Sequence, residues 1–182
     1  MNRLIILDRD GVINQDSDAY IKSPEEWLPI PGSAAAIARL NQAGYQVVVA
    51  TNQSGLARGY FDLSALEAIH RKMRAHLASA GARLDGIYFC PHGPDDHCDC
   101  RKPKAGLVDQ IVADYGEVTR APMVGDSLRD LQAGVLRGCR PVLVLTGKGR
   151  NTLKRGLPAE LGPVAVYPSL AGFADQFLKD PS

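Results

Sequence analysis

Aromatic side chains, net charge and long apolar runs are all scarce in this sequence of 182 residues. Aromatic residues make up 6% of the chain and the formal net charge is +1, so the chain lacks the broad basic field that nucleic-acid and anionic-membrane binding require. No apolar run is long enough to cross a bilayer, and the first predicted strand begins at residue 3, which leaves no room for a signal peptide. We therefore expect a cytoplasmic protein with neither a nucleic-acid nor a membrane partner.

Repeats, low-complexity tracts and linkers are missing as well, and a chain of this length can bury a full core, so we expect one domain spanning residues 1–182. Strand-like and helix-like segments alternate throughout. This alternation predicts an α/β fold, a doubly wound parallel sheet with helices on both faces. The helix predicted to open near Asp62 shows capping-box spacing at Ser64 and Glu67. The first predicted strand begins at residue 3, and the other predicted strands cover 46–51, 86–89, 121–125, 141–145 and 164–167. The predicted helices cover 33–43, 62–81, 105–115, 128–137 and the C-terminal segment.

Polar side chains follow four of the predicted strands at the point where each one stops. Asp8 and Asp10 come after the first, the run Thr51-Asn-Gln-Ser after the second, residues 90–104 after the third, and Gly125-Asp126 after the fourth. An Asp-rich turn closing a strand is common and needs no function. However, ligands of such sheets bind outside the carboxyl ends of the strands, so we expect these four groups to meet in one crevice.

The residue types at that edge suit phosphoryl transfer. One of two carboxylates can attack phosphorus while the other handles the proton, and a divalent cation can offset their repulsion. A third carboxylate, Asp126, can complete an oxygen shell for Mg²⁺. Lys102 supplies fixed positive charge, and a hydroxyl beside a glycine-containing turn can hold phosphate oxygens.

Four short motifs, in chain order, resemble those of the haloacid dehalogenase (HAD) superfamily of phosphatases: Asp8-Arg-Asp-Gly, Thr51-Asn-Gln, Arg101-Lys-Pro and Gly125-Asp. The resemblance covers residues 4 to about 150 and implies a Rossmann-like HAD core. It further implies that Asp8 is the nucleophile that forms an aspartyl-phosphate, that Asp10 is the general acid and base, and that Thr51 and Lys102 stabilise the phosphoryl group. Mg²⁺ would then be held by Asp8, the backbone carbonyl of Asp10, and Asp126.

Three of the four cysteines fall within eleven residues, which favours a metal site over disulfides in a reducing cytosol. Cys90, His92, Cys98 and Cys100 offer a closed tetrahedral Zn²⁺ set, and such a closed set predicts a structural ion. We expect His97 to be a solvated loop residue and Cys139 an inert core residue. The predicted zinc-binding loop, residues 90–104, would act as a minimal cap that places Arg101 and Lys102 over the crevice.

Within the superfamily, this loop resembles two bacterial families, the phosphatases of a heptose bisphosphate and those of histidinol phosphate. The runs Asp8 to Asn14 and Thr51 to Gly59 are similar to the heptose family. That likeness implies hydrolysis of the 7-phosphate of D-glycero-D-manno-heptose 1,7-bisphosphate, a small phosphorylated sugar used for lipopolysaccharide core precursors. Two features depart from the heptose pattern: the zinc loop is short, and Ser127 stands where a lysine often occurs. The substrate contacts implied are Asp16, Tyr20, Asn52, Gln53, Ser54 and Arg101, with Arg58 as a candidate for a second phosphate group.

Several alternatives remain open at this level. Arg58, Lys104 and Lys148 could each be a phosphate-binding or a solvated cation, and Tyr20 and Trp27 could wall a sugar or simply pack their loop. His70 and His76 lie on the polar side of a predicted helix and receive no role. A phospho-receiver domain, which is not an enzyme, has similar residue types, but it places its Asp on a later strand and lacks an acid two residues beyond it. We expect a monomeric phosphatase.

Overall fold

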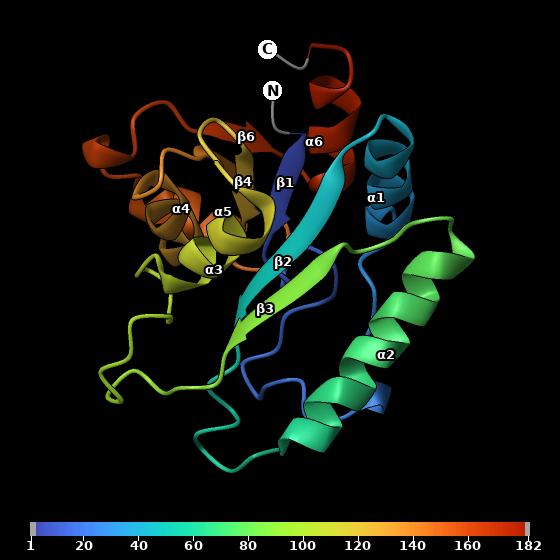
Figure 1. Ribbon diagram of the computed structural model, residues 1–182, viewed down its shortest axis with the longest axis vertical. Coiled ribbons are helices and arrows are strands. Elements are labelled where there is room, and N and C mark those ends of the chain that lie inside the picture. Colours follow the sequence, from blue (N-terminus) through green and yellow to red (C-terminus); the bar gives the residue numbers. More distant parts are fainter. Residues whose placement is uncertain (1–2, 181–182) are drawn as a thin grey trace.

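The computed structural model describes residues 3–180, and in this part of the chain six strands form one sheet in which all paired neighbours are parallel (Figure 1). The strands are β1 (Leu4–Leu7), β2 (Gln46–Asn52), β3 (Gly86–Cys90), β4 (Pro122–Gly125), β5 (Arg140–Val144) and β6 (Ala165–Tyr167). Their order across the sheet is β3-β2-β1-β4-β5-β6. The chain therefore builds outward from β1 in one direction, then crosses back and builds outward from β4 in the other.

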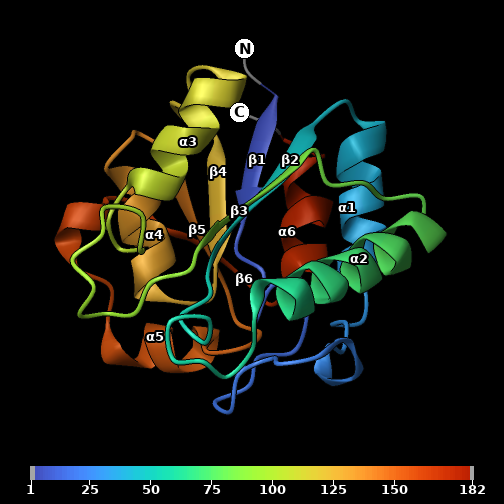
Figure 2. The same cartoon turned by 60° about the horizontal axis from the view of Figure 1, so that its bottom comes forward.

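Helices cover both faces of the sheet, which is seen nearly edge-on in Figure 2. Helices α1, α2 and α6 lie on one face, and α3 and α4 lie on the other. The α-helices are α1 (Ser33–Gln42), α2 (Leu63–Ser79), α3 (Gly106–Tyr115), α4 (Leu128–Val135), α5 (Gly149–Arg155) and α6 (Leu170–Phe177); Pro24–Glu26 and Ala159–Leu161 form short 3₁₀ helices. The predicted doubly wound α/β architecture is confirmed.

The apolar residues of β1 explain why it lies at the centre. Ile5 and Leu7 point to the layer of α1, α2 and α6, while Leu4 and Ile6 point to the layer of α3. All four side chains are buried. A strand with two apolar faces is stable only between two layers of helices, and each fully buried side chain of this kind contributes about 1.5–3 kcal/mol of hydrophobic free energy.

One local prediction is wrong, and one helix was missed. Helix α2 begins after Asp62, whose side chain accepts a hydrogen bond from the Ala65 N–H at 2.8 Å, so the N-cap is Asp62 and no capping box forms between Ser64 and Glu67. Helix α5 was not predicted, because Gly149 is the single buried residue among its seven and the sequence shows no apolar face there. Across the described chain, none of the helices combines the length and the apolar character that a bilayer span requires.

Candidate active site

A cavity of about 240 Å³ opens beyond the carboxyl ends of the strands, at the point between β1 and β4 where the strand order reverses. The end of β1 is held against β4 because the Asp8 N–H donates to the Val124 carbonyl at 2.9 Å. Charged side chains dominate the lining of the cavity. The carboxylates are Asp8, Asp10, Asp16, Asp18, Asp126 and Asp130, and the cations are Arg58, Arg101, Lys102, Arg129 and Lys148.

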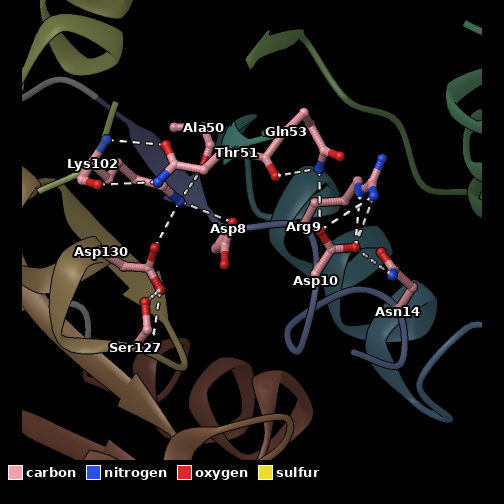
Figure 3. A network of polar contacts seen from close by, with 11 residues as sticks. Asp8, Arg9, Asp10, Asn14, Ala50, Thr51, Gln53, Lys102, Ser127 and Asp130 are labelled. Atoms are coloured by element: carbon pink, nitrogen blue, oxygen red, sulfur yellow. Dashed lines mark hydrogen bonds and ion pairs between the residues drawn. The ribbon is translucent and has the colours of Figure 1, made fainter. Parts of the chain in front are cut away.

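A buried ammonium group connects two of the carboxylates (Figure 3). Lys102 Nζ donates to Asp8 Oδ1 at 2.9 Å, to Asp130 Oδ1 at 2.7 Å and to the Ala50 carbonyl at 2.7 Å. The other oxygen of Asp130 accepts from the N–H and the hydroxyl of Ser127 at the start of α4. All three donor positions of the ammonium group are thus used, which fixes Lys102 directly behind Asp8.

The carboxylates outnumber the cations that neutralise them in the innermost part of the site. Oxygens of Asp8, Asp126 and Asp130 lie within 4.8 Å of one another, with Lys102 as the one ammonium group among them. Burial, and then the charge of Asp130, raise the pKa of Asp8 to about 7, although Lys102 opposes them. Burial, followed by the charges of Asp130 and Asp8, raises the pKa of Asp126 to about 8. This excess of negative charge fits a divalent cation.

Asp126 is packed against the backbone of two glycines. Its Oδ2 accepts the Lys148 N–H at 2.8 Å, and a Cβ added at Gly11 or Gly147 would lie 2.0 or 2.2 Å from that oxygen. Both glycines also have positive φ angles, of 82° and 54°. Glycine is required at the two positions because any side chain there would displace the carboxylate.

The carboxylate of Asp10 is held by three side chains rather than by Lys102 (Figure 3). Arg9 Nε and Nη2 donate to Oδ1 at 3.0 and 2.9 Å, Asn14 Nδ2 donates to Oδ1 at 2.9 Å, and Gln53 Nε2 donates to Oδ2 at 3.1 Å. Burial alone would raise the pKa of Asp10, but the Arg9 guanidinium and then these hydrogen bonds hold it below its usual value. The two aspartates of the first motif thus have opposite electrostatic environments.

The end of β2 contributes structural contacts as well as cavity-lining groups. Thr51 is buried outside the cavity lining, and its Oγ1 accepts from Gln53 Nε2 at 2.9 Å. The side chain of Asn52 pairs with the backbone of Lys102, donating to its carbonyl at 3.1 Å and accepting from its N–H at 3.0 Å. Asn52, Gln53 and Ser54 line the cavity. The second motif therefore positions the third.

Four predicted metal ligands converge beside the cavity. Cys90 Sγ lies 3.7 Å from Cys98 Sγ and 3.0 Å from Cys100 Sγ, and His92 Nδ1 lies 3.3 Å from Cys100 Sγ. Sulfur atoms around a tetrahedral Zn²⁺ are about 3.8 Å apart, given Zn–S bonds of about 2.3 Å. The set fits such an ion after small movements. His97 is exposed and lies outside this cluster, and Cys139 is buried in the core.

Three arginines line the cavity without a carboxylate partner among the described residues. These are Arg58, Arg101 and Arg129. Burial, and then the like charge of Arg129, lower the pKa of Arg101, so the two guanidinium groups are close enough to repel. By contrast, Lys148 forms ion pairs with Asp16 at 3.3 Å and Asp18 at 3.8 Å. The cluster of Arg58, Arg101 and Arg129, here called the arginine cluster, fits an anion.

Of the remaining candidates for ligand contact, Tyr20 lines the cavity, whereas Trp27 and Lys104 do not. Tyr20 lines the cavity, has a φ of 67°, and is backed by the Tyr60 ring at 5.1 Å between centroids. Trp27 is fully buried, so it packs its loop and cannot wall a ligand. Lys104 turns to the cysteine loop, where its Nζ donates to the Cys98 carbonyl at 2.6 Å.

Sequence reasoning missed Arg9, Asn14, Arg129 and Asp130 as parts of the site. For Asp130 a signal existed, because Ser127-Leu-Arg-Asp130 has capping-box spacing at a strand end. The other three could not be found from patterns, since nothing in the sequence shows that Arg9 turns inward or that Arg129 reaches the same space as Arg101. The sequence predicts His70 on the polar side of its helix, without a role, yet it is half-buried and its Nε2 lies 3.2 Å from Arg9 Nη1.

Comparisons with known proteins agree with this geometry. A family model described as HAD-hydrolase-like matches residues 99–173, and one described as polynucleotide kinase 3 phosphatase matches residues 3–128. The chain is 56% identical over 180 residues to the D-glycero-β-D-manno-heptose-1,7-bisphosphate 7-phosphatase of Bordetella bronchiseptica, covering 98% of this chain and 99% of that one. It is 54% identical over 177 residues to the Pseudomonas aeruginosa protein of the same name, covering 97% and 98%.

Solved structures of similar proteins share the fold. The B. bronchiseptica D,D-heptose 1,7-bisphosphate phosphatase, crystallised with magnesium and phosphate, superposes with a TM-score of 0.94 at 56% identity over 99% of both chains. The corresponding enzyme from Burkholderia thailandensis gives a TM-score of 0.77 at 46% identity, covering 98% of this chain and 100% of that one.

Proposed function

We propose, because this chain belongs to the HAD-like family of D-glycero-β-D-manno-heptose-1,7-bisphosphate 7-phosphatases, that it hydrolyses the 7-phosphate of that sugar bisphosphate. The observation that carries this proposal is the division of one cavity into two anion sites. Asp8 and Lys102 line it and are buried, whereas Arg58 and Arg129 are exposed and Arg101 is half-buried, so the arginine cluster lies nearer to solvent. A substrate with a phosphate at each end matches this arrangement.

Asp8 is the proposed nucleophile. Its Oδ1 is occupied by Lys102 Nζ, whereas no hydrogen bond within the described chain engages Oδ2, which is the oxygen available for attack on phosphorus. The ammonium group behind Asp8 would also stabilise the negative charge that builds on the transferring phosphoryl group. The products of this step are an aspartyl-phosphate and the sugar alkoxide.

Asp10 is the proposed proton carrier. It would protonate the leaving alkoxide, and it would later take a proton from the water that hydrolyses the aspartyl-phosphate. Its carboxyl group is ionised at neutral pH, because Arg9, Asn14 and Gln53 hold its pKa below the usual value. A phosphate dianion bound beside it would raise its pKa and so favour the protonated form that the first step needs.

Mg²⁺ fits the inner end of the cavity. Asp8, the backbone carbonyl of Asp10, and Asp126 are the proposed ligands, and the crowding of Asp8, Asp126 and Asp130 gives the negative charge that such an ion neutralises. The ion would supply charge stabilisation for the transferring phosphoryl group. Asp130 has the separate task of holding Lys102, as its two oxygens are already hydrogen-bonded.

The arginine cluster is the proposed binding site for the second phosphate group. Replacing Arg129 with Ala should raise the KM for the heptose 1,7-bisphosphate about tenfold, since one charge-assisted contact contributes about 1.5–3 kcal/mol. The KM for the heptose 7-monophosphate should stay within about twofold. Steady-state kinetics on both substrates measure the difference. Arg137→Ala is the matched control, because Arg137 pairs with Asp109 away from the cavity; an equal loss on both substrates for Arg129→Ala would contradict the assignment.

Zinc is the proposed occupant of the cysteine cluster. Purified protein should contain one Zn²⁺ per chain by elemental analysis, and Cys98→Ser should lower that content and weaken binding of the bisphosphate, because Arg101 follows the cluster directly. Cys139→Ala, which alters a cysteine outside the cluster, should retain the metal. Zinc-free protein whose Cys98 reacts freely with an alkylating reagent in the folded state would show that the site is not a zinc site.

The choice of substrate has a direct test. Turnover of the heptose 1,7-bisphosphate should exceed that of histidinol phosphate under the same conditions, because histidinol phosphate has no second phosphate for the arginine cluster. Preference for histidinol phosphate would reject the proposed substrate and keep the phosphatase assignment. The expected monomeric state and cytoplasmic location remain predictions, which light scattering and cell fractionation can test.

A further inference from the structure

A buried arginine separates the cavity from helix α2. Arg9 is 0% exposed and does not line the cavity, although it follows Asp8 directly in the chain. Its guanidinium group has Asp10 on one side, through Nε and Nη2, and His70 on the other, through Nη1. A buried guanidinium is costly unless its N–H groups are hydrogen-bonded, so both neighbours matter for where it lies.

His70 meets this arginine as a hydrogen-bond acceptor. Its Nε2 lies 3.2 Å from Arg9 Nη1, and since an arginine can only donate, the imidazole nitrogen must accept. Burial, and then the charge of Arg9, lower the pKa of His70 to about 3, so the ring is neutral. Arg74 and Asp10 are the other charged groups that act on it. The ring is also held edge-on to Phe89 of β3, with 6.4 Å between centroids.

We propose that His70 is a positioning residue for proton transfer by Asp10, because it fixes the plane of the Arg9 guanidinium that orients the Asp10 carboxylate. The contacts form one chain from α2 to the cavity: His70 to Arg9, and Arg9 to Asp10. Without the acceptor at His70, the guanidinium can rotate about its last torsions, and the paired carboxylate turns with it. Asn14 and Gln53 hold the two oxygens of Asp10 from other directions but do not contact the guanidinium.

The test compares two leaving groups. A sugar alkoxide needs a proton as it leaves, whereas p-nitrophenolate leaves without one, so misplacing Asp10 should harm only the first reaction. His70→Leu should lower kcat/KM for the sugar phosphate about tenfold and change kcat/KM for p-nitrophenyl phosphate by less than about twofold. For both substrates, kcat/KM reports the step in which the phosphoryl group is transferred to the enzyme. A reduced folded fraction lowers both values equally, so the ratio is unaffected by partial unfolding.

Matched variants separate positioning from packing. His70→Gln can place its amide oxygen where Nε2 lies, so it should keep the wild-type ratio, whereas His70→Asn is too short and should behave like His70→Leu. His76→Leu is the control on the same helix, because His76 contacts Trp27 rather than Arg9. An unchanged ratio in His70→Leu and His70→Asn, or a His70→Gln variant as impaired as they are, would overturn the proposal.

The inference rests on the proposed phosphatase activity, but the two can fail separately. If the wild-type protein hydrolyses other sugar phosphates and not the heptose bisphosphate, the proposed substrate is wrong and the ratio can still be measured with those esters. If the wild-type protein hydrolyses the heptose bisphosphate but the His70 variants keep the wild-type ratio of the two kcat/KM values, the proposed role of His70 is wrong and the proposed substrate stands.

Discussion

Replacing Asp8 with Asn should lower phosphate release by at least about 10³-fold while the protein stays folded. An amide of the same shape cannot attack phosphorus, so no aspartyl-phosphate forms. The fold should tolerate the change because Lys102 keeps Asp130 and the Ala50 carbonyl as partners. Removing a carboxylate whose pKa is raised to about 7 also relieves its repulsion with Asp130. We expect the free energy of unfolding to change by less than about 1.5 kcal/mol.

Phosphate release and urea unfolding of the same preparation measure the two effects. Asp109→Asn is the matched control, because Asp109 is an exposed aspartate that pairs with Arg137 away from the cavity. Its activity should equal that of the wild-type protein. Turnover retained in Asp8→Asn would reject covalent catalysis by Asp8, and a grossly destabilised variant would mean that Asp8 has a structural role.

Replacing Lys102 with Met should impair both stability and activity. The Lys102 side chain is 2% exposed and its ammonium group bonds both Asp8 and Asp130, so its loss leaves two buried carboxylates facing each other. Removing one partner of a buried ion pair typically costs about 3–5 kcal/mol. Activity should fall by about 10³-fold, because fixed charge at the transferring phosphoryl group is lost. Urea unfolding and steady-state kinetics measure the two losses.

A second substitution separates the two roles of Lys102. Adding Asp130→Asn to Lys102→Met removes one of the two opposed carboxylates, so part of the lost stability should return while activity stays low. Lys104→Met is the control two residues further along, and it should change stability by less than about 1 kcal/mol, because its side chain is largely exposed. A double variant no more stable than Lys102→Met would show that Asp130 is not the source of the repulsion.

The order and type of the main elements could be read from apolar periodicity. β1 and β2 are short continuous apolar runs, which is typical of strands buried on both faces, and the buried positions Leu66, Ile69 and Met73 of α2 follow the 3.6-residue period of a helix. Helix α5 could not be predicted, since its seven residues have a single buried member, Gly149, and no apolar face. Short polar helices are stabilised by tertiary contacts that a pattern does not show.

The predicted site residues divide in the same way. Asp8, Asp10, Asp126 and Lys102 meet in one cavity because each follows a parallel strand, and the carboxyl ends of parallel strands share one edge. Thr51 also follows a strand, yet it is buried outside the cavity lining, and it accepts a hydrogen bond from Gln53, which does line the cavity. The position of a residue in the sequence places it at the carboxyl edge of the sheet but does not decide whether its side chain lines the cavity.

By itself, the sequence determined the parallel α/β sheet, the edge at which the charged residues meet, and the four candidate metal ligands that lie close together in the chain. These features depend on the spacing of residues along the chain, which can be read directly from the sequence. Only the tertiary structure decided that Asp130 holds Lys102, that Arg129 joins Arg101, and that His70 contacts Arg9, 61 positions earlier in the chain. Such pairings depend on how the helices pack on the sheet. The free energy of that packing comes from burying apolar faces, and because this effect is non-directional, the apolar pattern does not show which polar groups will meet.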